Sequence, residues 1–209
     1  VDGAFNLNNE KVFVLGEIIH NEQIVGRLKD KGIVTIFSID DDRLSKGDTL
    51  IIRTHGESKI VFDKAEKKGL NGVDFTCPFV KAIQNKVCKY HNMGYKIIII
   101  GRKEHPEIIG INGWCDNSAI ITENLKDLPD LSSEKVCVVV QTTFSENKFD
   151  ELIKNFNCKD VKSLDIFKTI CYTTSDRQKE AETISKKCQA ILVLGGSKSS
   201  NTNNLYSIC

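Results

Sequence analysis

Short apolar runs alternate with amphipathic segments along most of the chain. The runs are rich in β-branched residues, and they read KVFVLG, GIVTIF, TLIIRT, NGVDF, KIIIIG, AIITE, KVCVVV and AILVLGG. Continuous runs of this kind, separated by helical patterns, are typical of strands buried on both faces of a parallel sheet. The pattern therefore predicts an α/β fold.

Two helices are predicted to begin near cysteines. Pro78, directly after Cys77, suits the first position of a helix. Apolar residues then recur at helical spacing up to a stop at Gly94, namely Val80, Ile83, Val87 and Tyr90. After Cys171, Ser175 and Gln178 have the spacing of a capping box. The expected apolar stripe of this second helix is Ala181, Ile184 and Cys188.

An internal repeat relates these cysteines to the strands that follow them. The same interval of 24 residues separates Cys77 from Gly101 and Cys171 from Gly195, and each glycine ends a predicted strand. A third copy ends its strand at Gly16, and the same interval places its cysteine near position −8, upstream of residue 1. No other cysteine shares this register.

Polar residues follow the predicted strands at repeated positions. His20, His105 and Ser199 each lie four residues after the glycine of their copy. Loops at the carboxyl ends of parallel strands are where open α/β sheets bind ligands, and the helix N-termini beyond them favour anions. A second set of strand ends carries His55 in RTHGES and the residues Gln141, Thr142 and Thr143 in VVQTTFS.

The repeat predicts three similar α/β modules with parallel sheets, each directing one cysteine and two polar loops at a shared centre. Their expected ranges are 1–77, 78–168 and 169–209, with the start of the first and the end of the third outside the chain. The chain is expected to be a fragment, since it does not begin with Met and stops at NNLYSIC, in the first turns of a predicted helix.

Ordinary structural roles compete with the functional ones. A lone cytosolic cysteine usually packs in a core, and the repeat register is what singles out Cys77 and Cys171 from the other six. Placement after strands favours a functional role for three of the four histidines, whereas His91 lies in the polar end of a helix. Glu107 alone could be a helix N-terminal acid, and Ser199–Asn201 alone could be a cap.

Composition narrows the class of protein. The chain has 29 Lys and Arg against 28 Asp and Glu, a net charge of +1, and so no basic excess that would indicate nucleic acid. Its apolar runs are too short to cross a membrane, and no signal peptide is visible. The eight cysteines form no CxxC pairs, and reduced thiols are expected. We therefore expect a soluble cytoplasmic protein.

Three thiolates from three modules could hold three corners of a cubane iron–sulfur cluster. The fourth iron, lacking a protein ligand, could bind a substrate oxygen while the cluster supplies electrons. Glu107, two residues from His105, would be placed to deliver protons. Neither a Walker loop nor GxGxxG occurs, so nucleotide chemistry has no support.

Several motifs together resemble the 4-hydroxy-3-methylbut-2-enyl diphosphate reductase family of the methylerythritol-phosphate isoprenoid pathway. They occur in the family's order across essentially the whole chain, and they are EIIHN, THG, DFTCP, HPEIIG, VQTTFS, ICYTTSDRQ and GGSKSSN. The resemblance implies three α/β modules arranged as a trefoil around a 4Fe–4S cluster with three cysteine ligands. It implies a reaction that removes the allylic hydroxyl with two electrons and protons. It also implies an electron donor such as ferredoxin or flavodoxin.

Residue roles follow from the same resemblance. Cys77 and Cys171 resemble the second and third cluster ligands, and Glu107 resembles the proton-delivering glutamate, with Thr142 beside the substrate hydroxyl. His105 is expected to belong to this catalytic group as well as to the diphosphate site. Residues that resemble diphosphate-binding positions or their helpers are His20, His55, His105, Gln141, Thr143, Ser199, Ser200 and Asn201.

The chain departs from the family pattern in three places. The segment of the first cysteine and the serine loop of the last module lie outside it, so these 209 residues alone are expected neither to assemble a normal cluster nor to close the site. Glu57 also replaces an expected apolar residue. Two other classes stay open, a zinc-binding structural protein and a non-catalytic iron–sulfur redox or regulatory protein.

Overall fold

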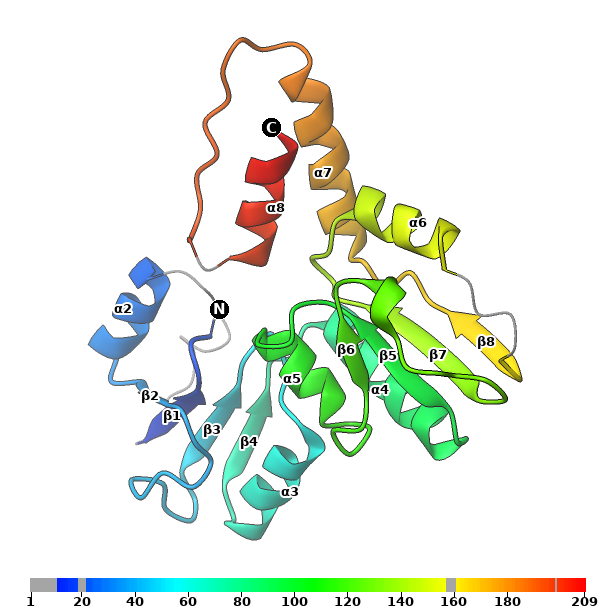
Figure 1. Ribbon diagram of the computed structural model, residues 1–209. Helices are drawn as coiled ribbons and strands as arrows, with labels where there is room; N and C mark the ends of the chain where they lie inside the picture. The colour runs from blue at the N-terminus through cyan, green and yellow to red at the C-terminus, as the bar shows by residue number, and fades with distance from the viewer. Residues whose placement is uncertain (1–10, 19–21, 157–160, 198) are drawn as a thin grey trace.

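Two four-stranded parallel sheets of identical strand order form most of the protein (Figure 1). The computed structural model describes residues 11–18, 22–156, 161–197 and 199–209. The first sheet has the order β2-β1-β3-β4, with β1 Val12–Leu15, β2 Val34–Ile36, β3 Thr49–Ile52 and β4 Asn71–Asp74. The second has the order β6-β5-β7-β8, with β5 Lys96–Ile100, β6 Ile120–Thr122, β7 Lys135–Val140 and β8 Ser163–Ile166.

Helices connect the strands and cover the sheets, as parallel pairing requires. They are α2 Glu22–Asp30, α3 Lys59–Lys67, α4 Pro78–Asn92, α5 Pro106–Asn112, the 3₁₀ helix η1 Leu125–Asp127, α6 Glu146–Lys154, α7 Tyr172–Ser185 and α8 Ser200–Ile208. In Figure 1, α7 and α8 lie together as a third group above the two sheets.

The core follows from the apolar runs. Residues 97–100 of β5 and 136–140 of β7 are all buried, and their register pairs Ile98 with Val138 and Ile100 with Val140. One face of this sheet packs against Val80, Ile83 and Val87 of α4. Burying each such side chain stabilises the fold by roughly 1.5–3 kcal/mol.

The predicted α/β class is confirmed by the strand pairing. Seven of the eight apolar runs form strands, and all pairs that the structure describes are parallel. The prediction for α4 is also confirmed, from Pro78 at its start to Gly94, whose φ of 78° ends the helical path. The proposed module boundaries stay a prediction.

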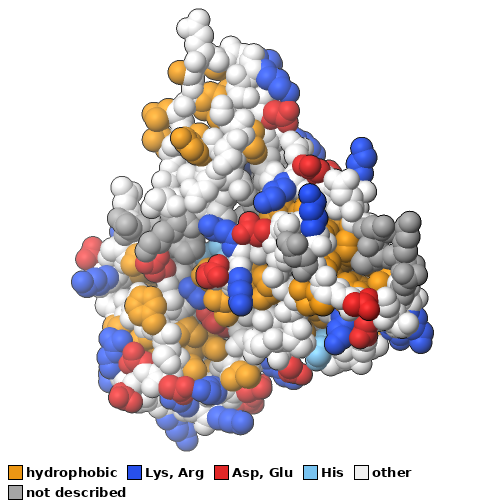
Figure 2. Space-filling model, in the orientation of Figure 1, with side chains coloured by type: hydrophobic (Ala, Val, Ile, Leu, Met, Phe, Trp, Pro, Cys, Tyr) orange, Lys and Arg blue, Asp and Glu red, His pale blue; other side chains and the backbone are white. Residues whose placement is uncertain are grey.

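The strand predicted for AILVLGG is wrong. Residues 190–194 have no strand pairing, and Leu192 and Leu194 are 81% and 82% exposed. A strand needs a neighbour for its backbone N–H and C=O groups, and no strand of the described residues lies beside this one. Figure 2 shows apolar side chains at the surface of this upper part of the molecule.

The predicted capping box is also wrong. The helix begins one turn earlier, at Tyr172, with Cys171 as its N-cap, so Ser175 lies inside α7. The expected apolar stripe is not buried, because Ile184 is 42% exposed and Cys188 lies exposed beyond the helix. The edge strand β8 was not predicted, since its sequence SLDI has a weak apolar pattern.

No helix in the described part of the chain combines the length and the apolar character that a membrane span requires.

Candidate functional site

Cys77 and Cys171 occupy equivalent positions relative to the two sheets. Each is the N-cap of the helix that follows the last strand of its sheet, α4 and α7. The Cys77 N–H donates to the Thr54 carbonyl at 3.0 Å, and the Cys171 N–H donates to the Thr142 carbonyl at 3.0 Å. Both cysteines have a ψ of 133°, and neither thiol caps its helix. Each sulfur therefore lies at a helix N-terminus, where the dipole favours negative charge.

An aromatic pair brings the two helix starts together. The rings of Phe79 and Tyr172 are 5.3 Å apart in an edge-to-face arrangement. Phe79 is two residues after Cys77, and Tyr172 directly follows Cys171, so both cysteines belong to one region. Both are half-buried, as ligands that meet an incoming group must be.

None of the other described cysteines is the N-cap of a helix that follows the last strand of a sheet. Burial raises the pKa of Cys115 to about 11 and that of Cys137 to about 12, which disfavours the thiolate form a metal needs. Cys188 and Cys209 are exposed. The donor set at the helix starts thus fits two thiolate ligands of an iron–sulfur cluster.

A complete set of ligands is not present within the described residues. Among them, no three His, Cys, Asp or Glu side chains come close enough to hold a metal ion. The cysteine predicted near position −8 precedes the chain, and His20 lies outside the described residues.

Glu107 and Thr142 form the polar contact that joins two elements of the second module. Glu107 lies in the first turn of α5 and is only 2% exposed. Its Oε1 accepts from the Thr142 N–H at 2.7 Å, and its Oε2 accepts from the Thr142 hydroxyl at 2.6 Å. Burial raises the pKa of Glu107, and the two bonds from Thr142 oppose that rise. A buried carboxyl of this kind retains its proton to higher pH than usual.

Two predicted histidines lie against each other near this pair. The rings of His55 and His105 are 5.4 Å apart and nearly perpendicular. His105 is the N-cap of α5, and its Nδ1 accepts from the Glu107 N–H at 3.2 Å. That bond leaves Nε2 to carry the proton of the neutral ring. The structure therefore brings together His55, from the loop after β3, and His105, from the loop after β5.

Gln141 and Thr143 mainly brace the loops. The Gln141 Nε2 donates to the Thr143 hydroxyl at 3.0 Å, and its Oε1 accepts from the Arg102 N–H at 3.2 Å. Both residues line a cavity of about 110 Å³ between this loop and α8, together with Arg102, Lys148 and Ser200.

The serine and asparagine residues are at the start of α8. Ser199 is its N-cap and accepts from the Thr202 N–H at 3.3 Å, while the Arg102 guanidinium donates to the Ser200 hydroxyl. The Asn201 Oδ1 is buried and has no hydrogen-bond partner in the described structure. Ser200 thus turns toward Arg102, and Asn201 retains an acceptor for another group.

Two cations at the strand ends were missed from the sequence. Arg53 pairs with Glu57 at 3.1 Å, and its guanidinium occupies the space that a Cβ on Gly16 would fill. Burial raises the pKa of Glu57, and Arg53 opposes that rise. Arg102 is the second cation. The sequence signal that could have identified them is their position, one residue after β3 for Arg53 and two residues after β5 for Arg102.

Comparisons with known proteins show to which family the whole chain is related. The sequence model of the LytB protein family matches residues 1–209. A relative from Thermoanaerobacter sp. (strain X514), named 4-hydroxy-3-methylbut-2-enyl diphosphate reductase, is 45% identical over 203 residues, which are 97% of this chain and 70% of that protein. A Clostridium acetobutylicum protein of the same name is 45% identical over 202 residues, 96% of this chain but 31% of its own length.

Solved structures agree with these matches. The E-1-hydroxy-2-methyl-but-2-enyl-4-diphosphate reductase from Plasmodium falciparum has a TM-score of 0.90 at 30% identity, covering 99% of this chain and 66% of that one. A second structure, (E)-4-hydroxy-3-methyl-but-2-enyl diphosphate reductase, the terminal enzyme of the non-mevalonate pathway, has a TM-score of 0.72 at 35% identity and is covered to 74%. The chain belongs to the LytB protein family.

Proposed function

We propose that the full-length protein is an oxidoreductase that removes the hydroxyl of 4-hydroxy-3-methylbut-2-enyl diphosphate. In this reaction the C–O bond breaks, two electrons and two protons enter, and water leaves with isopentenyl or dimethylallyl diphosphate as the product. The relatives named for this reductase support the proposal. The observation that carries it is the buried Glu107, which accepts two hydrogen bonds from Thr142. The Thr142 carbonyl in turn accepts a hydrogen bond from the Cys171 N–H.

Glu107 is the proposed proton donor. Because burial raises its pKa, the carboxyl retains its proton to higher pH than an exposed glutamate does, and it can release that proton to a leaving hydroxyl. The Thr142 hydroxyl lies 2.6 Å from Oε2, so it can accept the carboxyl proton while passing its own proton to the leaving hydroxyl. His105 fixes the first turn of α5 through the Glu107 N–H and so orients the carboxyl.

The diphosphate is proposed to bind where the strand-end loops and α8 begin. The imidazole N–H groups of His55 and His105, the Ser199 hydroxyl and the side-chain N–H of Asn201 are suitable donors for phosphate oxygens. The N-terminus of α8 adds backbone amides and a favourable dipole. His20, Gln141, Thr143 and Ser200 remain predicted members or helpers of this site.

Cys77 and Cys171 would hold two corners of a 4Fe–4S cluster, whose third protein ligand is the cysteine predicted near position −8. When bound, such a cluster supplies electrons singly and offers an iron as a Lewis acid. A ferredoxin or flavodoxin is the proposed electron donor. Free cysteines fit a reducing compartment, and we propose a cytoplasmic location.

The cofactor can be tested directly on the full-length protein. Anaerobic reconstitution should give absorbance near 400 nm with iron and sulfide, and Cys77→Ser and Cys171→Ser should each lose most of it. Cys88→Ser is the matched control, since Cys88 lies farther along the same helix α4 and should leave the cluster unchanged. Stoichiometric zinc without sulfide would replace this proposal with a structural zinc site. A cluster without diphosphate-dependent turnover would instead favour a redox or regulatory protein.

A further inference from the structure

Helix α7 contacts the rest of the protein through an unusual set of side chains. Its only buried residues in the described structure are Thr174 and Gln178, both polar. With the N-cap Cys171 they are spaced so that all three lie on one face of the helix. This face therefore docks by hydrogen bonding, because it has no buried apolar side chain to contribute.

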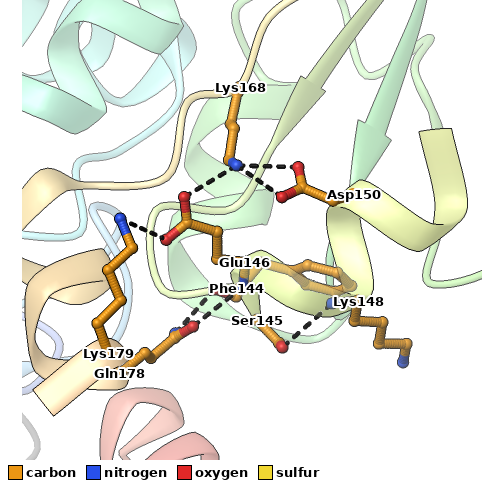
Figure 3. A network of polar contacts seen from close by, with 8 residues as sticks. All are labelled: Phe144, Ser145, Glu146, Lys148, Asp150, Lys168, Gln178 and Lys179. Atoms are coloured by element: carbon orange, nitrogen blue, oxygen red, sulfur yellow. Dashed lines mark hydrogen bonds and ion pairs between the residues drawn. The ribbon is translucent and has the colours of Figure 1, made fainter. Parts of the chain in front are cut away.

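The Gln178 side chain binds the main chain of the loop that follows β7 (Figure 3). Its Nε2 donates to the Phe144 carbonyl at 3.0 Å, and its Oε1 accepts from the Glu146 N–H at 3.0 Å. Gln178 is only 5% exposed. Since the Glu146 N–H lies in the first turn of α6, it has no partner within that helix, and Gln178 acts as an external cap.

The same loop is bound to α7 at its other end. The Cys171 N–H donates to the Thr142 carbonyl at 3.0 Å, so the docking face of α7 holds the loop at residues 142, 144 and 146. Thr142 in turn donates twice to Glu107. The contacts thus form a continuous path from Gln178 through the loop to the buried carboxyl.

The ion pairs around Gln178 are too exposed to hold the loop against α7 as the buried hydrogen bonds do. Lys168 and Lys179 approach Glu146 at 2.9 and 3.6 Å, but their side chains are 38% and 68% exposed (Figure 3). Exposed pairs contribute little, because water and salt screen them. Removing the Gln178 amide would instead leave a buried carbonyl and a buried N–H without partners.

We propose that Gln178 is a positioning residue that holds the loop after β7 against α7, so that Thr142 stays on Glu107 while Cys171 stays beside it. This role rests on the proposed function. Gln178 does not contact the substrate, and it acts through Thr142.

The test compares Gln178→Met, close in shape but without the amide, with Lys179→Met, which removes only an exposed ion pair on the same helix. In the full-length protein, Gln178→Met should lower kcat by about tenfold to a hundredfold, because small displacements of reacting groups have effects of this size. The KM should change by less than about threefold, since the proposed diphosphate contacts lie on other elements. Lys179→Met should behave as wild type in both parameters.

Two further readouts separate positioning from general destabilisation. Looser contact with Thr142 removes the bonds that lower the pKa of Glu107, so the alkaline limb of the kcat profile should move to higher pH in Gln178→Met. Amide hydrogen exchange of residues 142–147 should become faster in Gln178→Met and not in Lys179→Met.

The role of Gln178 and the proposed function would be overturned by different results. A kcat loss that only follows the folded fraction, with an unchanged pH profile and unchanged exchange, overturns the role of Gln178. Wild-type protein that carries a cluster but does not turn over the substrate overturns the proposed function. Faster exchange would then still support the Gln178 contact.

Discussion

At the residue scale, Glu107 is subject to two opposing influences. Burial at 2% exposure raises its pKa, and the N–H and hydroxyl of Thr142 lower it by binding the ionised form. Burial is the larger effect, so the net direction is upward. A proton held at this position is chemically useful only if a substrate group can reach it through Thr142.

Glu107→Gln tests this role with almost no change of shape. The amide can still accept from the Thr142 N–H and donate to its hydroxyl, so the fold and cluster content should be retained. Loss of the ionisable proton should lower kcat by about 10²-fold or more. Steady-state turnover of the full-length protein measures this, and near-normal kcat would remove Glu107 from the reaction.

The same substitution should change how stability depends on pH. The folded pKa of Glu107 lies above its ordinary value of 4.5, so the native state is favoured while the carboxyl is protonated. As the pH rises from about 4.5 through the folded pKa, the free energy of unfolding of wild type should fall relative to that of Glu107→Gln. Urea denaturation at a series of pH values measures the difference. A difference that stays constant or changes in the opposite sense would contradict the raised pKa.

Several site residues could be predicted from the sequence because their positions repeat. This holds for His105 and Ser199, each four residues after the glycine that ends a predicted strand. The roles of Glu107 and Thr142 came instead from their nearness to these loops and from the family resemblance. The contact between Glu107 and Thr142 at 2.6 Å is a result of the tertiary structure. The Arg53–Glu57 pair could not be predicted, because it depends on the space above Gly16. The bonds of Gln178 also depend on tertiary structure, and its sequence spacing from Ser175 pointed to a different contact.

At the element scale, α5 packs unusually close to the loop after β3. A Cβ on Gly110 would lie 3.1 Å from the Gly56 carbonyl oxygen and 3.2 Å from its carbon. Main-chain atoms cannot move aside as a flexible side chain can. This close approach keeps the start of α5, with His105, beside His55.

Gly110→Ala should separate the two elements. The gain in helix propensity, about 1 kcal/mol, opposes a larger overpacking cost of about 1–3 kcal/mol, so we expect net destabilisation. The KM for substrate should rise as His55 moves away from His105. The matched control is Gly26→Ala in α2, where a Cβ meets nothing within 4 Å and the propensity gain should stabilise the protein. Equal stabilisation by both substitutions in urea denaturation would contradict the packing argument.

Elements were predictable where the apolar pattern and the tertiary contacts agree. β5 and β7 are buried runs between helices, so the pattern predicts both strands, while their pairing with each other comes from the tertiary structure. Residues 190–194 have an equally apolar sequence but no strand beside them among the described residues, so the pattern alone gave the wrong structure. Strand formation depends on a partner, which local sequence does not contain.

At the scale of the whole molecule, the two sheets repeat one another in strand order and in the hydrogen bond that holds each cysteine. Thr54 accepts from Cys77, and Thr142 accepts from Cys171, each two residues past the third strand of its module along the chain. The repeat places both cysteines at helix starts that meet through Phe79 and Tyr172. One arrangement, used twice, therefore directs two thiols into one region.

The measurement that tests the central claim most directly is turnover of 4-hydroxy-3-methylbut-2-enyl diphosphate. It uses the full-length protein, reconstituted anaerobically and supplied with a reduced electron donor. The account predicts isopentenyl and dimethylallyl diphosphates, formed with consumption of two electrons per molecule and abolished in Cys77→Ser and Cys171→Ser. A protein that carries its cluster yet forms neither product under these conditions would contradict the account.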